Sequence, residues 1–492
     1  MTAPSASISM QRTPFRATPA LLALTAAAVA TVLASCGGDG GEAAWPPAAT
    51  ADARVKAAWV ELGADGQTIV RAITSADACP VISLDGVVAP MTLRAAAGTA
   101  AQRTTASDAA DSKPSAFPVT TCESRPRAGT LAASVAGRAL PLPKAQPRRI
   151  AVLADTGCRM KKADNAFQAC NDATAWPFAT IAATIASMRP DLVMHIGDYH
   201  YRENACPTDI AGCRDSPWGY GWDTWEADLF APAAPLLAAA PWVMGRGNHE
   251  ECARGGQGWM RFLDTRAYGA TLSCDAPAND NAANFSAPYA VPLGGDTQVV
   301  VFDSAKAGTA AFGASDFKFP IYQAQFRQVA ALVADTSKTS LFANHHPILA
   351  FAPIAGGAPV PGNLGLQAVM RTLEPTAYYP EGVKIALHGH VHDFQALNFA
   401  SAHPATFVTG NGGDNVDVNL PDPFPAGLAP APGVTLERIT HTNTFGFMMM
   451  ERDAEAGSAW RYLAYTRDGK LLTTCVPTGS KIACDRTGFL AP

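Results

Sequence analysis

The sequence predicts an α/β (α+β) fold of mixed sheets, preceded by a small all-β domain. Short apolar runs of the type that forms buried strands alternate with helical patterns after residue 147, which favours α/β layers. The chain then ends in further strand-like runs, which favour a mixed sheet or a sandwich of sheets. Its 38 prolines and 41 glycines indicate many turns and loops rather than a helical bundle. A length of 492 residues is sufficient for two folded units.

The amino end is typical of an exported protein. Two arginines precede an apolar run over 21–34, which is too short to span a bilayer comfortably and has the layout of a secretory signal. Leu33-Ala34-Ser35-Cys36 resembles the bacterial lipoprotein processing box, which implies that residues 1–36 are a signal peptide ending in a lipidated Cys36. Gly37 then implies sorting to the outer membrane. We therefore expect an exported lipoprotein, held at the periplasmic face or the cell surface by lipid on Cys36. The alternative is an ordinary signal with an unmodified Cys36.

Residues 37–54 are rich in glycine and proline and predict a flexible tether. The segment 55–145 shows only short strand signals, over 55–62, 68–73, 81–84 and 131–135, and predicts the small all-β domain. Within it, residues 95–118 are rich in Ala, Thr, Ser, Asp and Lys and have little to bury, so we expect a disordered insertion there. Prolines at 141, 143 and 147 mark the boundary with a second domain over 147–492.

The second domain alternates strands with helices before an all-strand tail. Strands are expected over 149–154, 191–196, 241–245, 297–302, 339–344 and 383–387. Helices are expected over about 174–188, 223–238, 320–334 and 363–373, the second of them interrupted by Pro232 and Pro235. The tail contributes strands over 394–399, 405–409, 445–451 and 459–466. In such layers, sites lie beyond the carboxyl ends of the strands.

Charge and cysteine content narrow the class of protein further. The net charge of −5 and the lack of a long basic run give no footprint for nucleic acid. A site that attracts phosphate would then draw its positive charge from something local, such as bound metal. Ten of the 11 cysteines remain after Cys36, an even number that suits disulfides in an oxidising compartment. Local pairing is the simplest of many connectivities: Cys79 with Cys122, Cys158 with Cys170, Cys206 with Cys213, Cys252 with Cys274, and Cys475 with Cys484.

Polar side chains follow five of the predicted strands. Asp155 follows 150–154, Asp198 follows 192–196, Asn248 and His249 follow 241–244, His345 and His346 follow 340–343, and His390 and His392 follow 383–387. A carboxylate at the end of a buried strand is costly unless a cation or a base meets it. Five strand ends that each carry an oxygen or imidazole ligand predict a site for two metal ions.

These blocks, taken in order, resemble those of the calcineurin-like metallophosphoesterases, and more narrowly the purple acid phosphatase branch. The blocks are Asp155-Thr156-Gly157, Gly197-Asp198-Tyr199-His200-Tyr201, Gly247-Asn248-His249-Glu250, His345-His346-Pro347 and Gly389-His390-Val391-His392. Gly157 stands where most of the superfamily has a metal-binding histidine. Tyr201 stands three residues after Asp198, where the branch has a tyrosinate ligand. The resemblance covers roughly 147–451. It implies a metallophosphoesterase-type β-sandwich of mixed sheets flanked by helices, with 147–492 as the catalytic domain.

The resemblance also implies roles for these residues. Asp155, Asp198, Tyr201 and His392 suit Fe(III), and Asn248, His345 and His390 suit a divalent Fe, Zn or Mn ion, with Asp198 shared between the two metals. His249 is then placed to contact phosphate or to protonate the leaving alkoxide, Glu250 to orient His249, and His346 to contact substrate. Tyr199 competes with Tyr201 as the ligand, and His346 competes with His345.

The expected activity is hydrolysis of a small-molecule phosphate monoester by a metal-activated hydroxide. The alternatives are a phosphodiesterase or nucleotidase on the same centre, and a surface lipoprotein that binds phosphate or metal without turnover. His195 and His388 are expected to be core or supporting histidines, and His403 and His441 to be surface residues. The plant members' extra substrate-binding histidines are missing from 348–362. Aromatic residues available to line a different pocket are Phe351, Trp218, Tyr220 and Trp222.

Overall fold

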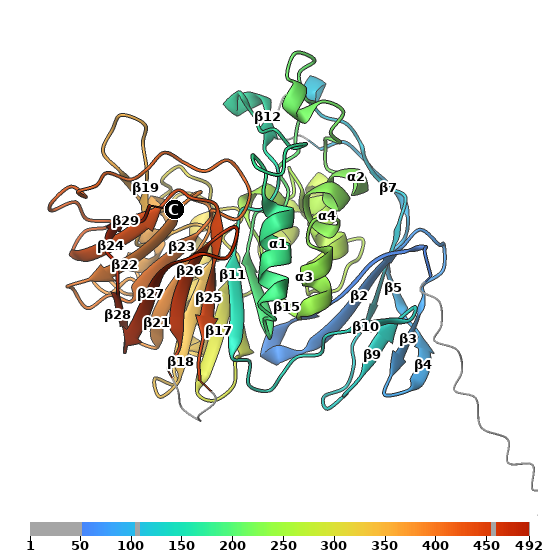
Figure 1. Ribbon diagram of the computed structural model, residues 1–492, viewed down its shortest axis with the longest axis horizontal. Coiled ribbons are helices and arrows are strands. Elements are labelled where there is room, and N and C mark those ends of the chain that lie inside the picture. Colours follow the sequence, from blue (N-terminus) through green and yellow to red (C-terminus); the bar gives the residue numbers. More distant parts are fainter. Residues whose placement is uncertain (1–51, 104–108, 454–458, 492) are drawn as a thin grey trace, which may run out of the picture. The chain divides into compact units, whose positions relative to one another are not determined.

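Two mixed β-sheets pack face to face in the computed structural model of the chain, which describes residues 52–103, 109–453 and 459–491 (Figure 1). All the described residues belong to one compact unit. Apolar side chains of both sheets meet between them, among them Val152, Met194, Leu341 and Leu387. The fold class predicted from the alternating strands and helices is therefore confirmed.

The first sheet has eleven strands within the described residues. Their order is β28 (Lys481–Cys484), β27 (Leu471–Thr478), β26 (Arg461–Thr466), β25 (Gly446–Glu451), β11 (Arg149–Leu153), β14 (Leu192–Ile196), β15 (Trp242–Gly245), β1 (Val55–Leu62), β2 (Thr68–Thr74), β8 (Thr120–Ser124) and β5 (Thr92–Ala95). Strands β11, β14, β15 and β1 run parallel to one another, and the outer pairs are antiparallel. Parallel pairing brings the carboxyl ends of β11, β14 and β15 to one edge.

In the described part of the chain, the second sheet has eight strands. Their order is β16 (Tyr289–Pro292), β17 (Thr297–Phe302), β18 (Thr339–Asn344), β21 (Val383–His388), β23 (Ala405–Thr409), β22 (Phe394–Phe399), β24 (Leu436–Thr442) and β29 (Gly488–Phe489). Strands β17, β18, β21 and β23 are parallel. Shorter two- and four-stranded sheets are formed by β10 (Arg138–Leu140), β9 (Ala133–Val135), β3 (Val81–Leu84) and β4 (Val87–Pro90); β12 (Met160–Lys161) and β13 (Ala166–Phe167); β19 (Phe351–Ala352) and β20 (Val360–Pro361); and β6 (Gly98–Ala100) and β7 (Ser115–Phe117).

Helices cover the outer faces of both sheets. The α-helices are α1 (Phe178–Ser187), α2 (Trp222–Trp225), α3 (Ala234–Ala239), α4 (Gly256–Phe262), α5 (Asp280–Ala283), α6 (Lys318–Leu332) and α7 (Leu364–Arg371). Figure 1 shows α1 and α3 beside β11 and β15, where Ile181 and Leu236 join the core of the first sheet. Phe326 of α6 and Val369 of α7 pack on the second sheet. Short helical turns are η1 (Ala64–Gly66), η2 (Ala109–Asp111), η3 (Lys162–Asp164), η4 (Ala211–Cys213), η5 (Glu226–Phe230), η6 (Asn248–Glu250) and η7 (Pro277–Asn279).

Most predicted elements have the expected type. Strands β17, β18, β22 and β23 have the predicted bounds. The helix predicted over 223–238 is instead α2, the π-type turn η5 and α3. Proline supplies no backbone N–H, so Pro232 and Pro235 interrupt the continuous hydrogen bonding of a helix.

The amino-terminal strands belong to the first sheet. The all-β character predicted for 55–145 is confirmed, and β1 pairs in parallel with β15, so β1, β2, β5 and β8 extend the sheet of the second domain. The domain boundary near residue 146 stays a prediction. Of the predicted disordered insertion 95–118, residues 104–108 lie outside the described residues. The described residues on either side differ from the prediction, because β6 and β7 pair and Phe117 is buried. Arg103 in this stretch pairs with Asp280 at 2.7 Å.

All five predicted disulfides are present. The predicted signal peptide, Cys36 and residues 37–51 of the tether lie outside the described residues. Within the part of the chain that the structure describes, no helix is both long and apolar enough to cross a bilayer.

Candidate active site

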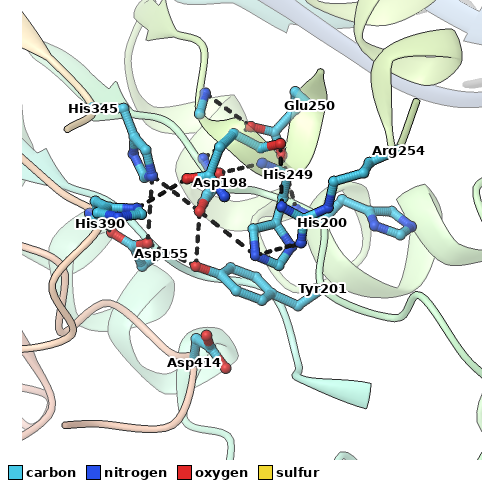
Figure 2. Close-up of polar contacts among 12 residues, drawn as sticks. Asp155, Asp198, His200, Tyr201, His249, Glu250, Arg254, His345, His390 and Asp414 are labelled. Atoms are coloured by element: carbon cyan, nitrogen blue, oxygen red, sulfur yellow. Dashed lines mark hydrogen bonds and ion pairs between the residues drawn. The ribbon is translucent and has the colours of Figure 1, made fainter. Parts of the chain in front are cut away.

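The seven predicted ligand side chains lie together at the carboxyl ends of parallel strands of both sheets. Figure 2 shows five of them, Asp155, Asp198, Tyr201, His345 and His390. Asp155, Asp198 and Asn248 follow β11, β14 and β15, whereas His345 and His390 follow β18 and β21. Asp155, Asp198 and His390 have positive φ angles of 58°, 58° and 70°. Residues other than glycine rarely adopt this conformation, and its cost of roughly 1–3 kcal/mol is typical of functional sites.

Asp198 is at the centre of the cluster. One of its carboxylate oxygens lies 2.9 Å from Nε2 of His345 and 3.0 Å from the hydroxyl of Tyr201. The other oxygen accepts a hydrogen bond of 2.8 Å from the backbone N–H of His249. The carboxylate is buried and faces groups from both sheets, so a cation on either side would contact it.

Tyr201, rather than Tyr199, points into the cluster. The Tyr201 hydroxyl donates to Asp155 at 2.7 Å and lies 3.1 Å from Nε2 of His392. The Tyr199 hydroxyl instead donates to the backbone carbonyl of Gly245, on the far side of the loop. Burial and the carboxylates of Asp155 and Asp198 raise the pKa of Tyr201 well above its ordinary value. A phenolate at this position therefore needs a cation beside it.

Asn248, His345 and His390 complete the cluster. Nδ1 of His390 lies 2.9 Å from the side-chain oxygen of Asn248. Nδ1 of His345 lies 2.8 Å from the carbonyl of Ile196, which leaves Nε2 facing Asp198. One ligand atom each from Asp198, His345 and His390 lie within 4.8 Å of one another. Nε2 of His345 is buried and has no partner with hydrogen-bond geometry, so this donor set fits a metal ion.

The carboxylates change the titration of two histidines. Burial alone would lower the pKa of His345, but Asp198 and Asp155 raise it to about 9. Burial is likewise outweighed at His392, whose pKa Asp414 and Asp155 raise to about 9. Both raised pKa values result from the excess of negative charge that the carboxylates bring to the cluster. This excess is the electrostatic condition for binding cations.

His249 is oriented by Glu203 and Arg254, neither of which the sequence singled out. Nδ1 of His249 lies 2.9 Å from the buried Glu203 carboxylate, and its Nε2 lies 3.9 Å from Asp198. Arg254 contacts Glu203 and both nitrogens of the His249 ring, and Figure 2 shows Arg254 beside His249. Burial and the Arg254 charge lower the pKa of His249 to about 4. The ring lies over Tyr201, with centroids 3.8 Å apart.

Glu250 does not orient His249, contrary to the prediction. Its carboxylate accepts backbone N–H groups of Asp198 at 2.9 Å, Tyr199 at 2.8 Å, His200 at 3.2 Å and Gly247 at 3.0 Å. The short turn η6 directs the Glu250 side chain back beneath the loop that follows β14, away from the His249 ring. Glu250 therefore holds the backbone of the Asp198 loop.

The second ring nitrogen of His392 is also held. Nδ1 lies 2.9 Å from the carbonyl of Asn415 and 3.5 Å from the carboxylate of Asp414. Asp414 is buried and forms an ion pair of 2.6 Å with Arg159. Figure 2 shows Asp414 on the Tyr201 side of the cluster. Asp414, Arg159, Glu203 and Arg254 were missed because they lie outside the strand-end blocks. The one available signal was a pair of charges, Arg202-Glu203, directly after Tyr201.

The remaining histidines have varied surroundings. His346 is buried beside His390, with ring centroids 4.3 Å apart, and its Nδ1 lies 3.1 Å from the hydroxyl of Ser304. His195 and His388 are buried in β14 and β21 and bond to Thr156 and to the Asn344 carbonyl, as core or supporting histidines would. His200, which precedes Tyr201, points away to the hydroxyl of Thr224.

Predictions about several residues outside the ligand set are wrong. His403 and His441 are buried rather than on the surface, His403 between Ser401 and the Thr376 carbonyl. Phe351 and Trp222 lie in the apolar cores. Large aromatic side chains bury much apolar area in a core, here against Phe424 for Phe351 and against Phe230 for Trp222. Tyr220 is also buried and donates to Glu203 at 3.0 Å.

Two glycines of the strand-end blocks, Gly157 and Gly389, have steric explanations. A Cβ at Gly157 would lie 2.6 Å from the carbonyl of Tyr199 and 2.9 Å from the amide of Tyr201. Any side chain here would displace the loop that carries Tyr201, so position 157 cannot supply a ligand. A Cβ at Gly389 would lie 2.7 Å from Asp155, which explains how the backbone before His390 approaches the cluster.

Comparisons with known proteins agree with this architecture. A family model of the calcineurin-like phosphoesterases matches residues 148–394, about half of the chain, and the chain therefore belongs to that family. The superfamily predicted from the five blocks is thus confirmed. No sequence among the curated proteins matches the chain.

Two solved structures have a similar fold. The purple acid phosphatase PPD1 of yellow lupin (Lupinus luteus) seeds is 14% identical, with 85% of this chain and 73% of that chain covered and a TM-score of 0.50. The structure of PhoD is 11% identical, with 88% of this chain and 92% of that chain covered and a TM-score of 0.51. At these identities the likeness establishes the fold, a metallophosphoesterase sandwich.

Proposed function

We propose that the protein is a dinuclear-metal phosphohydrolase that cleaves phosphate monoesters, similar to the purple acid phosphatases. The observation that carries the proposal is the convergence of seven side chains from five strand ends around the Asp198 carboxylate. Asp155, Asp198, Tyr201 and His392 would hold Fe(III). Asn248, His345 and His390, together with Asp198, would hold a divalent Fe, Zn or Mn ion.

Bound cations would lower the pKa of the attacking water and neutralise charge on the phosphoryl oxygens. The residues of the chain would do the rest. His249, whose Nδ1 lies 2.9 Å from Glu203 and whose Nε2 lies 3.9 Å from Asp198 and 2.7 Å from Arg254, would contact phosphate or, as the imidazolium, pass a proton to the leaving alkoxide. Glu250 holds the Asp198 loop through four backbone N–H groups. His346 would contact the substrate from the second sheet.

The choice of Fe(III) is supported by the Tyr201 hydroxyl, which lies among Asp155, Asp198 and His392. A tyrosinate bound to Fe(III) absorbs visible light, so the iron-loaded protein should be purple and Tyr201→Phe should remove the band. Elemental analysis of both proteins controls for metal content. A metal-replete wild type whose spectrum has no such band, or one that Tyr201→Phe leaves unchanged, contradicts the Fe(III)–tyrosinate assignment.

Monoester specificity is tested by turnover of a chromogenic monoester and the matching diester. Faster turnover of the monoester is expected, and preference for the diester would favour a phosphodiesterase or nucleotidase on the same centre. The third possibility, a binding lipoprotein without turnover, predicts that His249→Ala changes neither activity nor phosphate affinity. We expect His249→Ala to lower kcat with the metal content retained.

The chain is also proposed to be an exported lipoprotein of the outer membrane. Five disulfides among the described residues support an oxidising compartment. The wild type should fractionate with membranes of a bacterial host and incorporate labelled palmitate, whereas Cys36→Ser should do neither. Equal fractionation and labelling of the two proteins would refute the lipid anchor.

A further inference from the structure

His346 has an arrangement of hydrogen bonds that the metal cluster does not explain. The side chain is 1% exposed and Nδ1 lies 3.1 Å from the hydroxyl of Ser304, which is itself buried at the end of β17. Nε2, on the opposite side of the ring, has no hydrogen-bond partner among the described residues. A buried polar group without a partner is costly, so such a group in a site indicates a ligand that supplies the partner.

The neighbouring bonds determine which nitrogen carries the proton. Asn344 donates through Nδ2 to the His346 carbonyl at 2.7 Å, which identifies that atom as the nitrogen of the amide. The same Nδ2 donates to the Ser304 hydroxyl at 3.3 Å, and the backbone N–H of His346 donates to this hydroxyl at 3.1 Å. A serine hydroxyl accepts two hydrogen bonds and donates one. Both acceptor positions are filled, so the Ser304 O–H must donate to Nδ1.

An imidazole whose Nδ1 accepts a hydrogen bond is neutral and carries its proton on Nε2. The free Nε2–H is therefore a donor, beside the His390 ring at a centroid distance of 4.3 Å. A donor in this position suits an anionic oxygen and is a poor metal ligand, because a protonated nitrogen has no lone pair to offer. His345, the adjacent residue, has the opposite arrangement, with Nδ1 held by the Ile196 carbonyl and Nε2 facing Asp198.

We infer that Ser304 and Asn344 fix His346 in its Nε2–H form, so that His346 donates a hydrogen bond to a phosphoryl oxygen of the substrate. Ser304 and Asn344 are then positioning residues, and His346 is the residue that touches substrate. The inference rests on the proposed function for the phosphate at the site. It adds a neutral donor from the second sheet to the residues that recognise phosphate, and it makes Ser304, in the loop after β17, a residue that positions this donor.

The test is calorimetric binding of inorganic phosphate to the metal-loaded full-length protein. His346→Ala removes a hydrogen bond to a charged group. The free energy of such a bond corresponds to about a tenfold change in affinity, so phosphate binding should weaken by about tenfold. Ser304→Thr and Ser304→Val have the same shape and differ in the hydroxyl alone. Ser304→Thr should therefore bind phosphate several-fold more tightly than Ser304→Val, whatever strain the added methyl group causes. Ser340→Ala, at an equally buried serine of β18, is the control for a lost buried hydroxyl.

Each outcome is decisive when metal content and thermal midpoint are measured beside binding. Equal phosphate affinity of Ser304→Thr and Ser304→Val overturns the role of Ser304. Wild-type affinity in His346→Ala overturns the phosphate contact, and loss of a metal ion from His346→Ala would make His346 a ligand and overturn it too. A metal-loaded wild type that hydrolyses no phosphate ester but shows the expected order of phosphate affinities refutes the proposed function alone. A wild type that neither binds phosphate nor hydrolyses refutes both.

Discussion

The two sheets contribute chemically different halves of the candidate site. The first sheet supplies oxygen ligands, the carboxylates of Asp155 and Asp198, the phenol of Tyr201 and the amide of Asn248. The second sheet supplies imidazoles, three of which are predicted ligands: His345, His390 and His392. The oxygen half is held by a carboxylate, since Glu250 accepts four backbone N–H groups beneath the Asp198 loop. The imidazole half is held by backbone carbonyls, those of Ile196 and Asn415.

This difference explains why the cluster needs cations and where they would be held. The carboxylates alone would repel one another, and in their surroundings they raise the pKa values of His345 and His392 to about 9. A cation between the halves satisfies the oxygens and the imidazoles at once. Asp198 faces both halves and should therefore matter more than any other residue of the site.

The largest effect is expected from Asp198→Asn, which removes the charge at the centre and keeps the shape. Several kcal/mol of transition-state stabilisation depend on the two metal ions, so kcat should fall by at least about 10³-fold together with metal content. Turnover of 4-nitrophenyl phosphate and elemental analysis measure both. Asp209→Asn, at an exposed residue of the connection after β14, should change neither. A fully metal-loaded, active Asp198→Asn protein would remove Asp198 from the centre.

A smaller effect is expected from Glu250→Gln, which tests the support of the oxygen half. The amide group of glutamine would face backbone donors that now meet a carboxylate, so the Asp198 loop should loosen. Loss of a group that supports metal ligands typically costs 10- to 100-fold, so metal affinity should fall by about 10- to 100-fold. Competition with a chelator measures the affinity. Glu251→Gln, at the next residue, which pairs with Lys306, is the matched control. Unchanged metal affinity in Glu250→Gln would show that the Asp198 loop keeps its conformation without the Glu250 carboxylate.

How much of the site the sequence could predict follows from the same comparison. The ligands lie directly after buried strands, so hydrophobic patterning located Asp155, Asp198 and His345 without any structure. Tyr201 was separable from Tyr199 by spacing alone. The supporting residues were not predictable in this way, because Glu203, Ser304 and Asp414 reach the cluster through the packing of loops. Glu250 illustrates why sequence neighbours are a poor guide to such contacts. It lies next to His249 in the sequence, but its carboxylate binds the backbone of the Asp198 loop.

The fold was predictable to a similar depth. Strands with apolar runs, such as β17 and β18, were located to the residue, whereas the place of β1 beside β15 was not. Glu61 of β1 pairs with Trp242 of β15, and pairing between residues so far apart in the sequence leaves no local pattern. A buried arginine of these strands was also not predictable. Arg71 of β2 pairs with Glu61 at 2.9 Å and donates to the carbonyls of Phe262, the last residue of α4, and of Asp264.

The smallest effect is expected from Glu203→Gln, which leaves both halves of the ligand set intact. Glutamine keeps the size of Glu203 but weakens its hold on Nδ1 of His249, so metal content should be unchanged. General acid–base catalysis contributes about 10²- to 10⁴-fold, and partial misplacement of the group should cost about tenfold of it. The loss should appear with an alkyl phosphate, whose leaving group needs a proton, and be less than about twofold with 4-nitrophenyl phosphate, whose leaving group does not.

Two comparisons keep this last expectation specific to His249. Glu226→Gln, at a half-buried acid of η5, should leave both substrates unaffected. Equal losses with both substrates in Glu203→Gln would mean that His249 acts on the phosphoryl group itself and not on the leaving oxygen. Loss of metal in Glu203→Gln would instead mean that Glu203 also helps to hold the oxygen ligands of the first sheet in place. The supports of the ligands and of the proton-carrying histidine would then be one network, shared through Arg254, which contacts Glu203, the His249 ring and the carbonyl of Asn248.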